Sequence, residues 1–180
     1  MKKVIATLLL TVSMSAHSVE PTFSNEQMEN LQYAYAFGEQ FQKNGKYKEN
    51  PHQHNGLGYI MAGLTWQESS AGVNTGLNKD KHHAYGIFQN YLPTVRERVK
   101  QVGWTMTDKE IIKMISKREN SARWAYIELS YWLNIHKGDI RKTLSSYNAG
   151  WNVKAGNTYA SQVLEKANYL KSRGLLKMVD

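Results

Sequence analysis

Apolar residues recur at helical spacing in one segment of the chain after another, and this periodicity constrains the fold more than any other feature. One such face consists of Leu57, Ile60, Met61 and Leu64. Strict alternation of apolar and polar residues, which would indicate strands, is sparse. We therefore predict a mainly α fold in one domain, since 180 residues are enough chain to bury a core.

Signals for helix starts divide these apolar segments. Ser24 with Gln27 and Thr107 with Glu110 match the capping box, in which two side chains satisfy the first free N–H groups of a helix. Further expected start signals are Pro93 in a first helical turn and N-cap residues at Asp139 and Thr158. These signals predict a series of helices joined by short connections.

The region 69–90 breaks the helical pattern with several glycines and polar residues. We expect a small irregular or β insert there. The helix that begins near Ser24 either packs on the rest of the chain or forms an accessory arm. We divide the chain into a signal peptide at 1–18, an N-terminal helical extension at 19–50 and the main domain at 51–180.

The first residues have the pattern of an export signal. Lys2 and Lys3 precede a short apolar run, and Ala16 and Ser18 are small residues at the positions that signal peptidases prefer. The alternative is a buried N-terminal helix. The run is too short to span a bilayer, and no other segment is predicted to do so. We therefore expect cleavage near Ser18 and a periplasmic or secreted protein.

The mature protein is expected to be basic and to lack disulfides. The formal charge is +8, and the loss of two lysines with the signal lowers it to +6. Such a charge favours an anionic partner such as peptidoglycan, teichoic acid, lipid headgroups or nucleic acid. Export removes the chain from cytoplasmic DNA, so we expect no nucleic-acid partner. With 0 cysteines, the core alone must hold the fold together.

Glu68 occupies a position where the helical pattern predicts an apolar residue. An ionised, unpaired carboxylate on such a face costs several kcal/mol. Burial raises the pKa of a carboxyl and keeps it protonated near neutral pH, which is the state that a general acid requires. The periodicity alone also fits a carboxylate that points into solvent from a helix end.

Three short segments add to this pattern. Residues 68–72 read ESSAG, residues 84–89 read AYGIFQ and residues 146–150 read SYNAG. In this order and spacing they resemble the soluble lytic transglycosylase family of the lysozyme-like superfamily. Tyr159 resembles the tyrosine that opens the last helix of that family. The resemblance covers about residues 55–171 and implies a lysozyme-like helical domain at 51–180.

The resemblance implies an activity and a role for each matching residue. The family cleaves the β-1,4 bond between MurNAc and GlcNAc in peptidoglycan and forms 1,6-anhydro-MurNAc ends. Glu68 is expected to protonate the leaving oxygen and then to act as the base. The residues expected to support it or to bind substrate are Ser69, Gln89, Tyr91, Tyr147, Asn148, Trp151 and Tyr159. Asn148 is expected to fix its turn, while Ala149 and Gly150 let the chain pass closely.

Several residues depart from the family pattern. Ile87 and Phe88 replace the usual leucine and methionine, which is a conservative change. Tyr91 stands where many members have methionine. Trp124 stands where the family has glycine, four residues after Asn120. It puts in doubt the packing of the long helix that Trp124, Ile127, Tyr131 and Ile135 predict, ending at Gly138.

Asp80 bears on the mechanism. Many transglycosylases have serine at this offset before the motif glycine, whereas goose-type lysozymes have aspartate there and share the ESSAG-like string. Inverting hydrolysis needs a second carboxylate to activate water, but a transglycosylase does not. Asp80 is therefore a catalytic base, a substrate contact or a solvated loop residue. The alternatives to a transglycosylase are a goose-type-like inverting muramidase and a non-catalytic wall-binding module.

No cofactor and no metal are predicted. Four of the six histidines, His52, His54, His82 and His83, form two close groups but lack carboxylate partners at ligand spacing. Among the tryptophans, Trp151 is the best candidate for the cleft, and Trp124 fits a core position. The expected partners are peptidoglycan glycan strands and, by analogy with small family members, a wall-spanning secretion, conjugation or phage machine. We expect a monomer.

Overall fold

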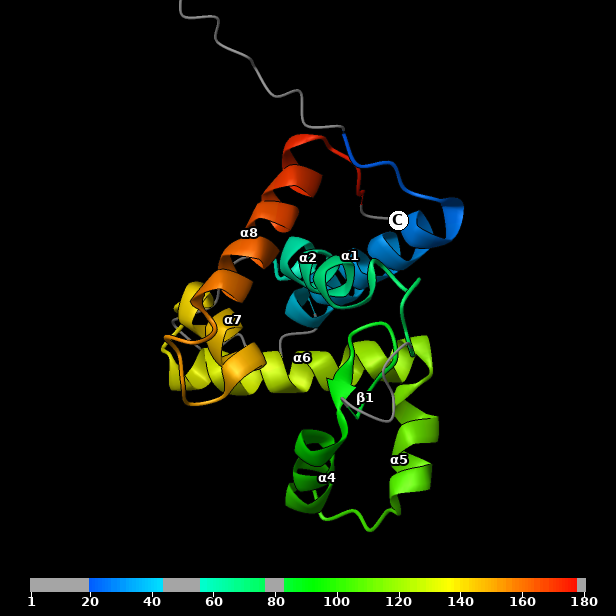
Figure 1. Cartoon of the computed structure of the whole chain (residues 1–180), viewed down its shortest axis with the longest axis vertical. Helices are drawn as coiled ribbons and strands as arrows, with labels where there is room; N and C mark the ends of the chain where they lie inside the picture. The colour runs from blue at the N-terminus through cyan, green and yellow to red at the C-terminus, as the bar shows by residue number, and fades with distance from the viewer. Residues whose placement is uncertain (1–19, 44–55, 77–82, 178–180) are drawn as a thin grey trace, which may run out of the picture.

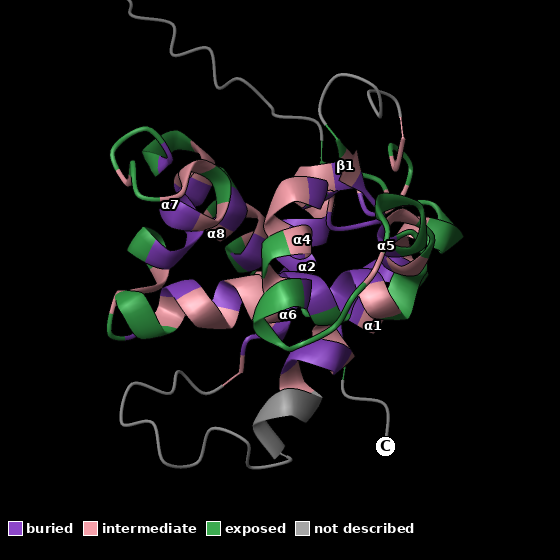
Figure 2. Cartoon of the chain, turned by 90° about the horizontal axis from the view of Figure 1, so that it is seen from below, coloured by how far each residue is buried: buried purple, intermediate pink, exposed green. Residues whose placement is uncertain are grey.

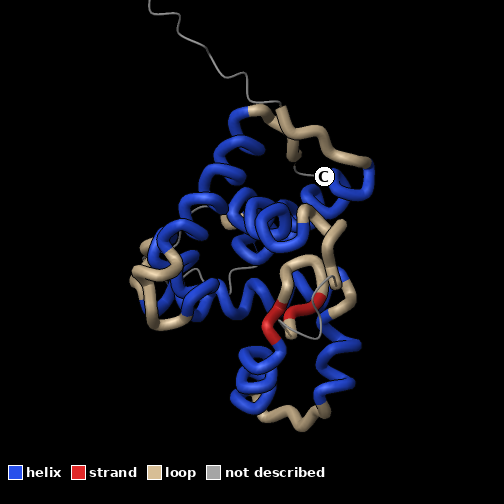
Figure 3. The backbone as a smooth tube through the Cα atoms, viewed as in Figure 1, coloured by secondary structure: helices blue, strands red, loops and turns tan. Residues whose placement is uncertain are grey.

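The computed structural model describes residues 20–43, 56–76 and 83–177. Their helices are α1 (Asn25–Lys43), α2 (Gly58–Ser69), α4 (Leu92–Gln101), α5 (Asp108–Ile115), α6 (Arg118–Ile135), α7 (Ile140–Ala149) and α8 (Asn157–Ser172). The short strands β1 (Ala84–Tyr85) and β2 (Asn90–Tyr91) pair antiparallel, with Ala84 opposite Tyr91. The prediction of a mainly α fold with a small β insert is confirmed (Figure 3).

Helix α6 lies across the middle of the molecule (Figure 1). On one side, α2 packs between α1 and α8, and α7 joins α8 to the end of α6. On the other side, α4 and α5 pack against each other, and the hairpin of β1 and β2 connects α2 to α4. The long helix therefore joins two groups of elements.

The buried side chains form two clusters that follow this division. The larger cluster draws on α1, α2, α6, α7 and α8 and includes Leu31, Leu64 and Leu129. The smaller cluster draws on β1, α4, α5 and α6 and includes Val99 and Ile111. Figure 2 shows the buried residues on the sides of the helices that face one another, with exposed residues on the outer turns.

Most of the expected helix starts are confirmed. Ser24 and Gln27 exchange hydrogen bonds at the start of α1, and Thr107 forms the expected capping box at the start of α5. The Asp139 side chain accepts from the Lys142 N–H at the start of α7. The expectation for Thr158 is wrong, because α8 begins one residue earlier, at Asn157.

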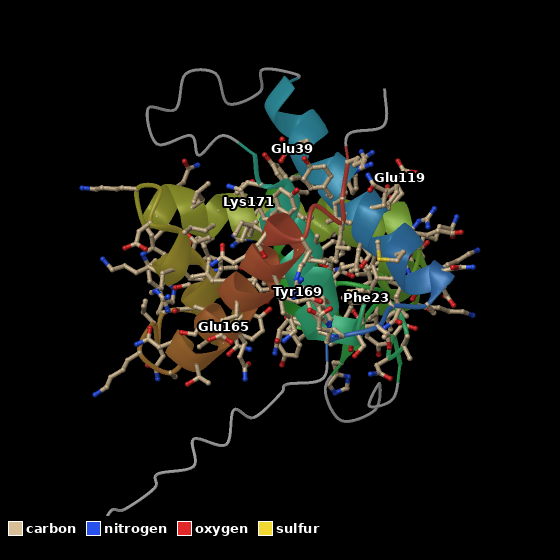
Figure 4. All side chains as sticks on the ribbon, turned by 90° about the horizontal axis from the view of Figure 1, so that it is seen from above. Phe23, Glu39, Glu119, Glu165, Tyr169 and Lys171 are labelled. Atoms are coloured by element: carbon tan, nitrogen blue, oxygen red, sulfur yellow. The ribbon has the colours of Figure 1, made fainter. Side chains whose placement is uncertain are left out.

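Helix α1 packs on the rest of the chain, which decides between the two alternatives for this segment. The Asn30 amide donates to the carbonyl oxygen of Ala71 at 2.9 Å. Just before the helix, Phe23 packs edge-on against Trp66, whose ring also contacts Tyr169 of α8 (Figure 4). The predicted signal peptide at 1–18 lies outside the described residues, and the domain boundaries stay predictions.

None of the helices in the described ranges is both long enough and apolar enough to cross a membrane.

Candidate active site

The end of α2 is fixed to the hairpin turn by buried hydroxyl groups. The Ser69 hydroxyl donates to the carbonyl oxygen of Ile87 at 2.6 Å and accepts from the Gly72 N–H at 2.8 Å. The Thr65 hydroxyl donates to the same Ile87 carbonyl at 3.0 Å. These bonds hold the last turn of α2, and with it Glu68, in a fixed position relative to the hairpin. Ser69 thus ties the end of α2 to the hairpin turn.

The hairpin turn lies against α5 and α6 with little free space. Gly86 has φ +77°, and an added Cβ would clash with the Ile115 carbonyl oxygen and the Ser121 hydroxyl. Only glycine fits both the backbone conformation and the space. Next to it, Ser121 Oγ accepts from the Phe88 N–H and from the Asn90 amide. The turn therefore holds Gln89 and Asn90 beside the end of α2.

A pocket of about 370 Å³ opens where these elements meet. Its described lining comes from α2, β2 with the preceding turn, α4, α6 and α7. The lining residues are Glu68, Gln89, Asn90, Tyr91, Thr94, Val95, Arg98, Trp124, Glu128, Tyr147 and Asn148. Its volume is at the lower end of the range for ligand pockets, roughly 300–1,000 Å³. Five of the predicted site residues, Glu68, Gln89, Tyr91, Tyr147 and Asn148, are thus brought to one pocket.

Glu68 is half-buried at this pocket, on the last turn of α2. Burial raises the pKa of its carboxyl to about 7, because removal from water disfavours the charged form. A hydrogen bond from the Tyr159 hydroxyl to Oε1 acts in the opposite direction and lowers the pKa. Burial is the larger effect, so the carboxyl is substantially protonated near neutral pH.

Two tyrosines lie close to Glu68. Tyr159, in the first turn of α8, donates to the carboxylate, and burial together with that negative charge raises its own pKa well above the usual value. Tyr147 lines the pocket from α7, and its hydroxyl donates to the Phe88 carbonyl at 3.4 Å. Burial, and then the charges of Glu68 and Glu128, raise the pKa of Tyr147 well above its usual value. Both phenols therefore stay neutral and can donate hydrogen bonds.

The other motif residues differ in what holds them. The Gln89 amide donates to the Gly86 carbonyl at 2.8 Å, which fixes it within the turn. Asn148 makes no side-chain hydrogen bond to the described part of the chain and is exposed at the pocket, so its role in the turn stays a prediction. Gly150 was expected to allow close passage of the chain, and this is wrong. An added Cβ there would meet no atom of the described residues within 4 Å; instead, glycine suits the backbone φ of +59° at this position.

Two other predicted residues lie elsewhere. Trp151 is 72% exposed and does not line the pocket, and its ring packs edge-on against Trp132 at 5.0 Å. Asp80 lies outside the described residues. Tyr91, which does line the pocket, is exposed at 51%.

The sequence interpretation missed the wall formed by α4 and α6. Arg98 and Glu128 line the pocket there and form an ion pair at 2.9 Å, and Trp124 is a buried part of the same wall. A signal was present in the sequence, because Glu128 falls four residues from Trp124 and four from Trp132 on one helical face. This is the same pattern, a carboxylate on an apolar face, that singled out Glu68.

No group of three or more histidine, cysteine, aspartate or glutamate side chains within the described ranges could hold a metal ion. Of the four histidines considered, only His83 belongs to those ranges; His52, His54 and His82 lie outside them.

The chemical capacity of the pocket follows from Glu68. A carboxyl with a pKa near 7 can both give and take a proton near neutral pH. Its neighbours include neutral phenol donors and an ion-paired carboxylate at Glu128. This arrangement can protonate a leaving oxygen and then accept a proton from an attacking group.

Fold and site together define a mainly α protein with a small pocket and a half-buried glutamate of raised pKa at its wall. The chain is 66% identical over 181 residues to the phage T4 protein named "Uncharacterized 20.7 kDa protein in vs-regB intergenic region". The match covers 100% of this chain and 99% of that protein. The chain belongs to the family of this phage protein. No family model matches the sequence, and no solved structure matches the chain.

Proposed function

We propose that this protein is an exported peptidoglycan lytic transglycosylase that cleaves the MurNAc–GlcNAc β-1,4 bond, with Glu68 as its catalytic acid and base. The observation that carries the proposal is the carboxyl of Glu68, raised in pKa to about 7 at the wall of a pocket. The lytic transglycosylase-like motifs supply Glu68 and three further residues that line this pocket, Gln89, Tyr147 and Asn148. Because the relative belongs to phage T4, opening of the wall for phage passage is the favoured setting.

The reaction uses one carboxyl group twice. Protonated Glu68 gives its proton to the glycosidic oxygen, the bond from that oxygen to C1 of MurNAc breaks, and positive charge develops at C1. The Glu68 carboxylate then takes the proton of the C6 hydroxyl of the same sugar. The C6 oxygen bonds to C1, which forms the 1,6-anhydro end and returns Glu68 to its protonated state. No water is consumed, and no second carboxylate is required.

The roles of the neighbours follow from their contacts. Tyr159 holds one carboxylate oxygen of Glu68 through its hydroxyl and so orients the proton-carrying group. Tyr147 presents a neutral phenol to the same pocket. Gln89, tied to the hairpin turn through its amide nitrogen, keeps its amide oxygen for a substrate donor. Each would act on orientation of the sugar or of Glu68.

Mass spectrometry of the muropeptides released from purified peptidoglycan tests the proposal. We expect 1,6-anhydro ends from the wild-type protein and a loss of about two to four orders of magnitude in rate for Glu68→Gln, whose amide cannot donate the proton. Glu165→Gln on the exposed face of α8 is the matched control, because it removes one carboxylate charge from a residue that does not line the pocket (Glu165 is labelled in Figure 4).

The Asp80→Asn variant separates the two mechanisms. A transglycosylase should retain most of its activity in this variant, because the C6 hydroxyl is the attacking group. Reducing ends in the products, together with an inactive Asp80→Asn variant, would instead identify an inverting muramidase. Near-wild-type lysis by Glu68→Gln would refute the role of Glu68, and binding to the wall without any cleavage would identify a binding module.

A further inference from the structure

The wall of the pocket formed by α4 and α6 carries an ion pair that the proposed reaction does not use. Arg98 Nε donates to Glu128 Oε2 at 2.9 Å, and the two side chains are only 14% and 16% exposed. The Trp132 indole N–H donates to the other oxygen, Oε1, at 2.6 Å. The Arg98 guanidinium also lies 3.6 Å from the centre of the Tyr131 ring. Both charged groups are therefore held in place before any ligand arrives.

Stability alone does not account for this pair. Desolvation of two charges offsets much of their attraction, so that apolar residues of similar volume often stabilise a fold as well as a largely buried ion pair does. Val95 and Trp124, which line the same wall, show that apolar packing is available there. Both members of the ion pair nevertheless reach the pocket.

The pair keeps unused hydrogen-bonding capacity. Arg98 uses Nε for Glu128 and Nη1 for the Gln101 side chain, whereas Nη2 has no hydrogen-bond partner among the described residues. Each carboxylate oxygen of Glu128 accepts one bond from the described chain and has a further lone pair. The wall can thus donate and accept at adjacent positions, which matches a ligand with hydroxyl and amide groups.

The net charge of the pair determines which ligands suit the wall. Because Arg98 is already neutralised by Glu128, an anionic ligand gains little from the guanidinium and is repelled by the carboxylate. A cationic ligand likewise gains little from the Glu128 carboxylate and is repelled by the Arg98 guanidinium. An uncharged polar ligand can bond to both groups, and Trp124, which lines the same wall but is only 4% exposed, adds a small apolar contact beside them.

We propose that Arg98 and Glu128 form a recognition site for an uncharged saccharide ring, that of N-acetylglucosamine, and discriminate against a sugar that carries a free carboxylate. The inference rests on the proposed function, because the sugar recognised at this wall is a ring of the same peptidoglycan strand that the proposed reaction cleaves. The pair binds and selects, and it takes no part in the proton transfers of Glu68.

Two saccharide probes test this selection. The affinities for triacetylchitotriose, which is uncharged, and for N-acetylmuramic acid, which carries a carboxylate, are measured by tryptophan fluorescence in a Glu68→Gln background. Glu128→Gln keeps the shape but leaves Arg98 with an uncompensated charge. We expect the ratio of the two affinities to shift by about tenfold or more toward the acidic sugar, the effect of one hydrogen bond to a charged group.

The control for this variant is a second ion pair that also begins on α4. Arg96 bonds to both oxygens of Asp108, and neither residue lines the pocket. Asp108→Asn makes the same change of charge and should leave the ratio unchanged. An unchanged ratio in a folded Glu128→Gln protein, or an equal shift in Asp108→Asn, would overturn the proposal.

A double variant keeps the test valid if Glu128→Gln fails to fold. Arg98→Met combined with Glu128→Leu replaces both charges with side chains of similar volume and should keep the fold. It should lose about tenfold in affinity for triacetylchitotriose, and retained affinity would overturn the proposal. Because these measurements record binding, they are separate from the lysis assay. An absence of lysis by the wild-type protein would refute the proposed function without changing the affinities.

Discussion

The Tyr159 hydroxyl donates a hydrogen bond to Glu68 Oε1 and so joins the first turn of α8 to the last turn of α2. The bond favours the ionised form of the carboxyl, whereas burial favours the protonated form, and burial is the larger of the two effects. The pKa of Glu68 therefore depends on a residue 91 positions away in the sequence.

Removal of that hydroxyl should shift the pH dependence of activity. In Tyr159→Phe, burial acts without the opposing hydrogen bond, so the pKa of Glu68 rises above about 7. We expect the alkaline limb of the pH–rate profile to move to higher pH. Tyr169→Phe, on the same helix but packed against Trp66, is the control. An alkaline limb that stays in place in Tyr159→Phe would contradict this account of the site.

Glu68→Gln should change stability in a pH-dependent way. Between pH 4.5 and about 7 the native carboxyl stays protonated while the unfolded chain ionises. The native state then binds more protons than the unfolded state, so the free energy of unfolding of the wild-type protein falls as pH rises through this window. The glutamine variant has no such titration. Between pH 4.5 and about 7, the free energy of unfolding of the variant should therefore rise by on the order of 1–3 kcal/mol relative to that of the wild type.

Urea unfolding at several pH values measures this difference. A constant difference between the two proteins from pH 4 to pH 8 would show that the native pKa of Glu68 is not raised.

Tyr147→Phe should reduce turnover more than it reduces stability. The change removes one hydroxyl, whose bond to the Phe88 carbonyl is long at 3.4 Å, and leaves the packing of the ring in place. We expect a loss of turnover with a melting temperature close to that of the wild type. A large fall in melting temperature with an unchanged rate would mark Tyr147 as structural.

Ser69→Ala should destabilise the fold. The variant leaves the Gly72 N–H without its acceptor and removes a donor from the Ile87 carbonyl, at a cost of about 1–3 kcal/mol. Thermal unfolding measures the effect, roughly 2–4 °C for each kcal/mol. Ser116→Ala, which removes an exposed hydroxyl bonded to the Ile112 carbonyl at the end of α5, should change stability by less than about 0.5 kcal/mol. Equal effects of the two changes would contradict the support assigned to Ser69.

Local interactions made much of the fold predictable from the sequence. The capping box at Thr107 and the cap at Asp139 depend on residues three positions apart, and both are present in the structure. Thr158 shows the limit of this reasoning. Gly156 precedes the helix instead. A side chain at that position would clash with the backbone of Ser145, and such a contact across the fold is not visible locally.

The site was predictable where short motifs supplied it. Glu68, Gln89 and Tyr147 were expected together and line one pocket. The pairing of Arg98 with Glu128 was not predicted, because it joins two helices across 30 residues of sequence. The position of Trp151 could also not be predicted from the sequence, since its ring packs on Trp132 rather than at the pocket.

The division of the core by α6 has a consequence for local unfolding. The smaller cluster, which α4 and α5 build on one side of that helix, buries less apolar surface than the larger cluster on the other. Its opening therefore costs less free energy than global unfolding, and amide hydrogens of α4 and α5 should exchange with solvent before those of α2 and α8. Such an opening would separate Arg98 from Glu128 while the helix of Glu68 stays folded. The pocket would thus be lost at temperatures at which most of the protein is still native.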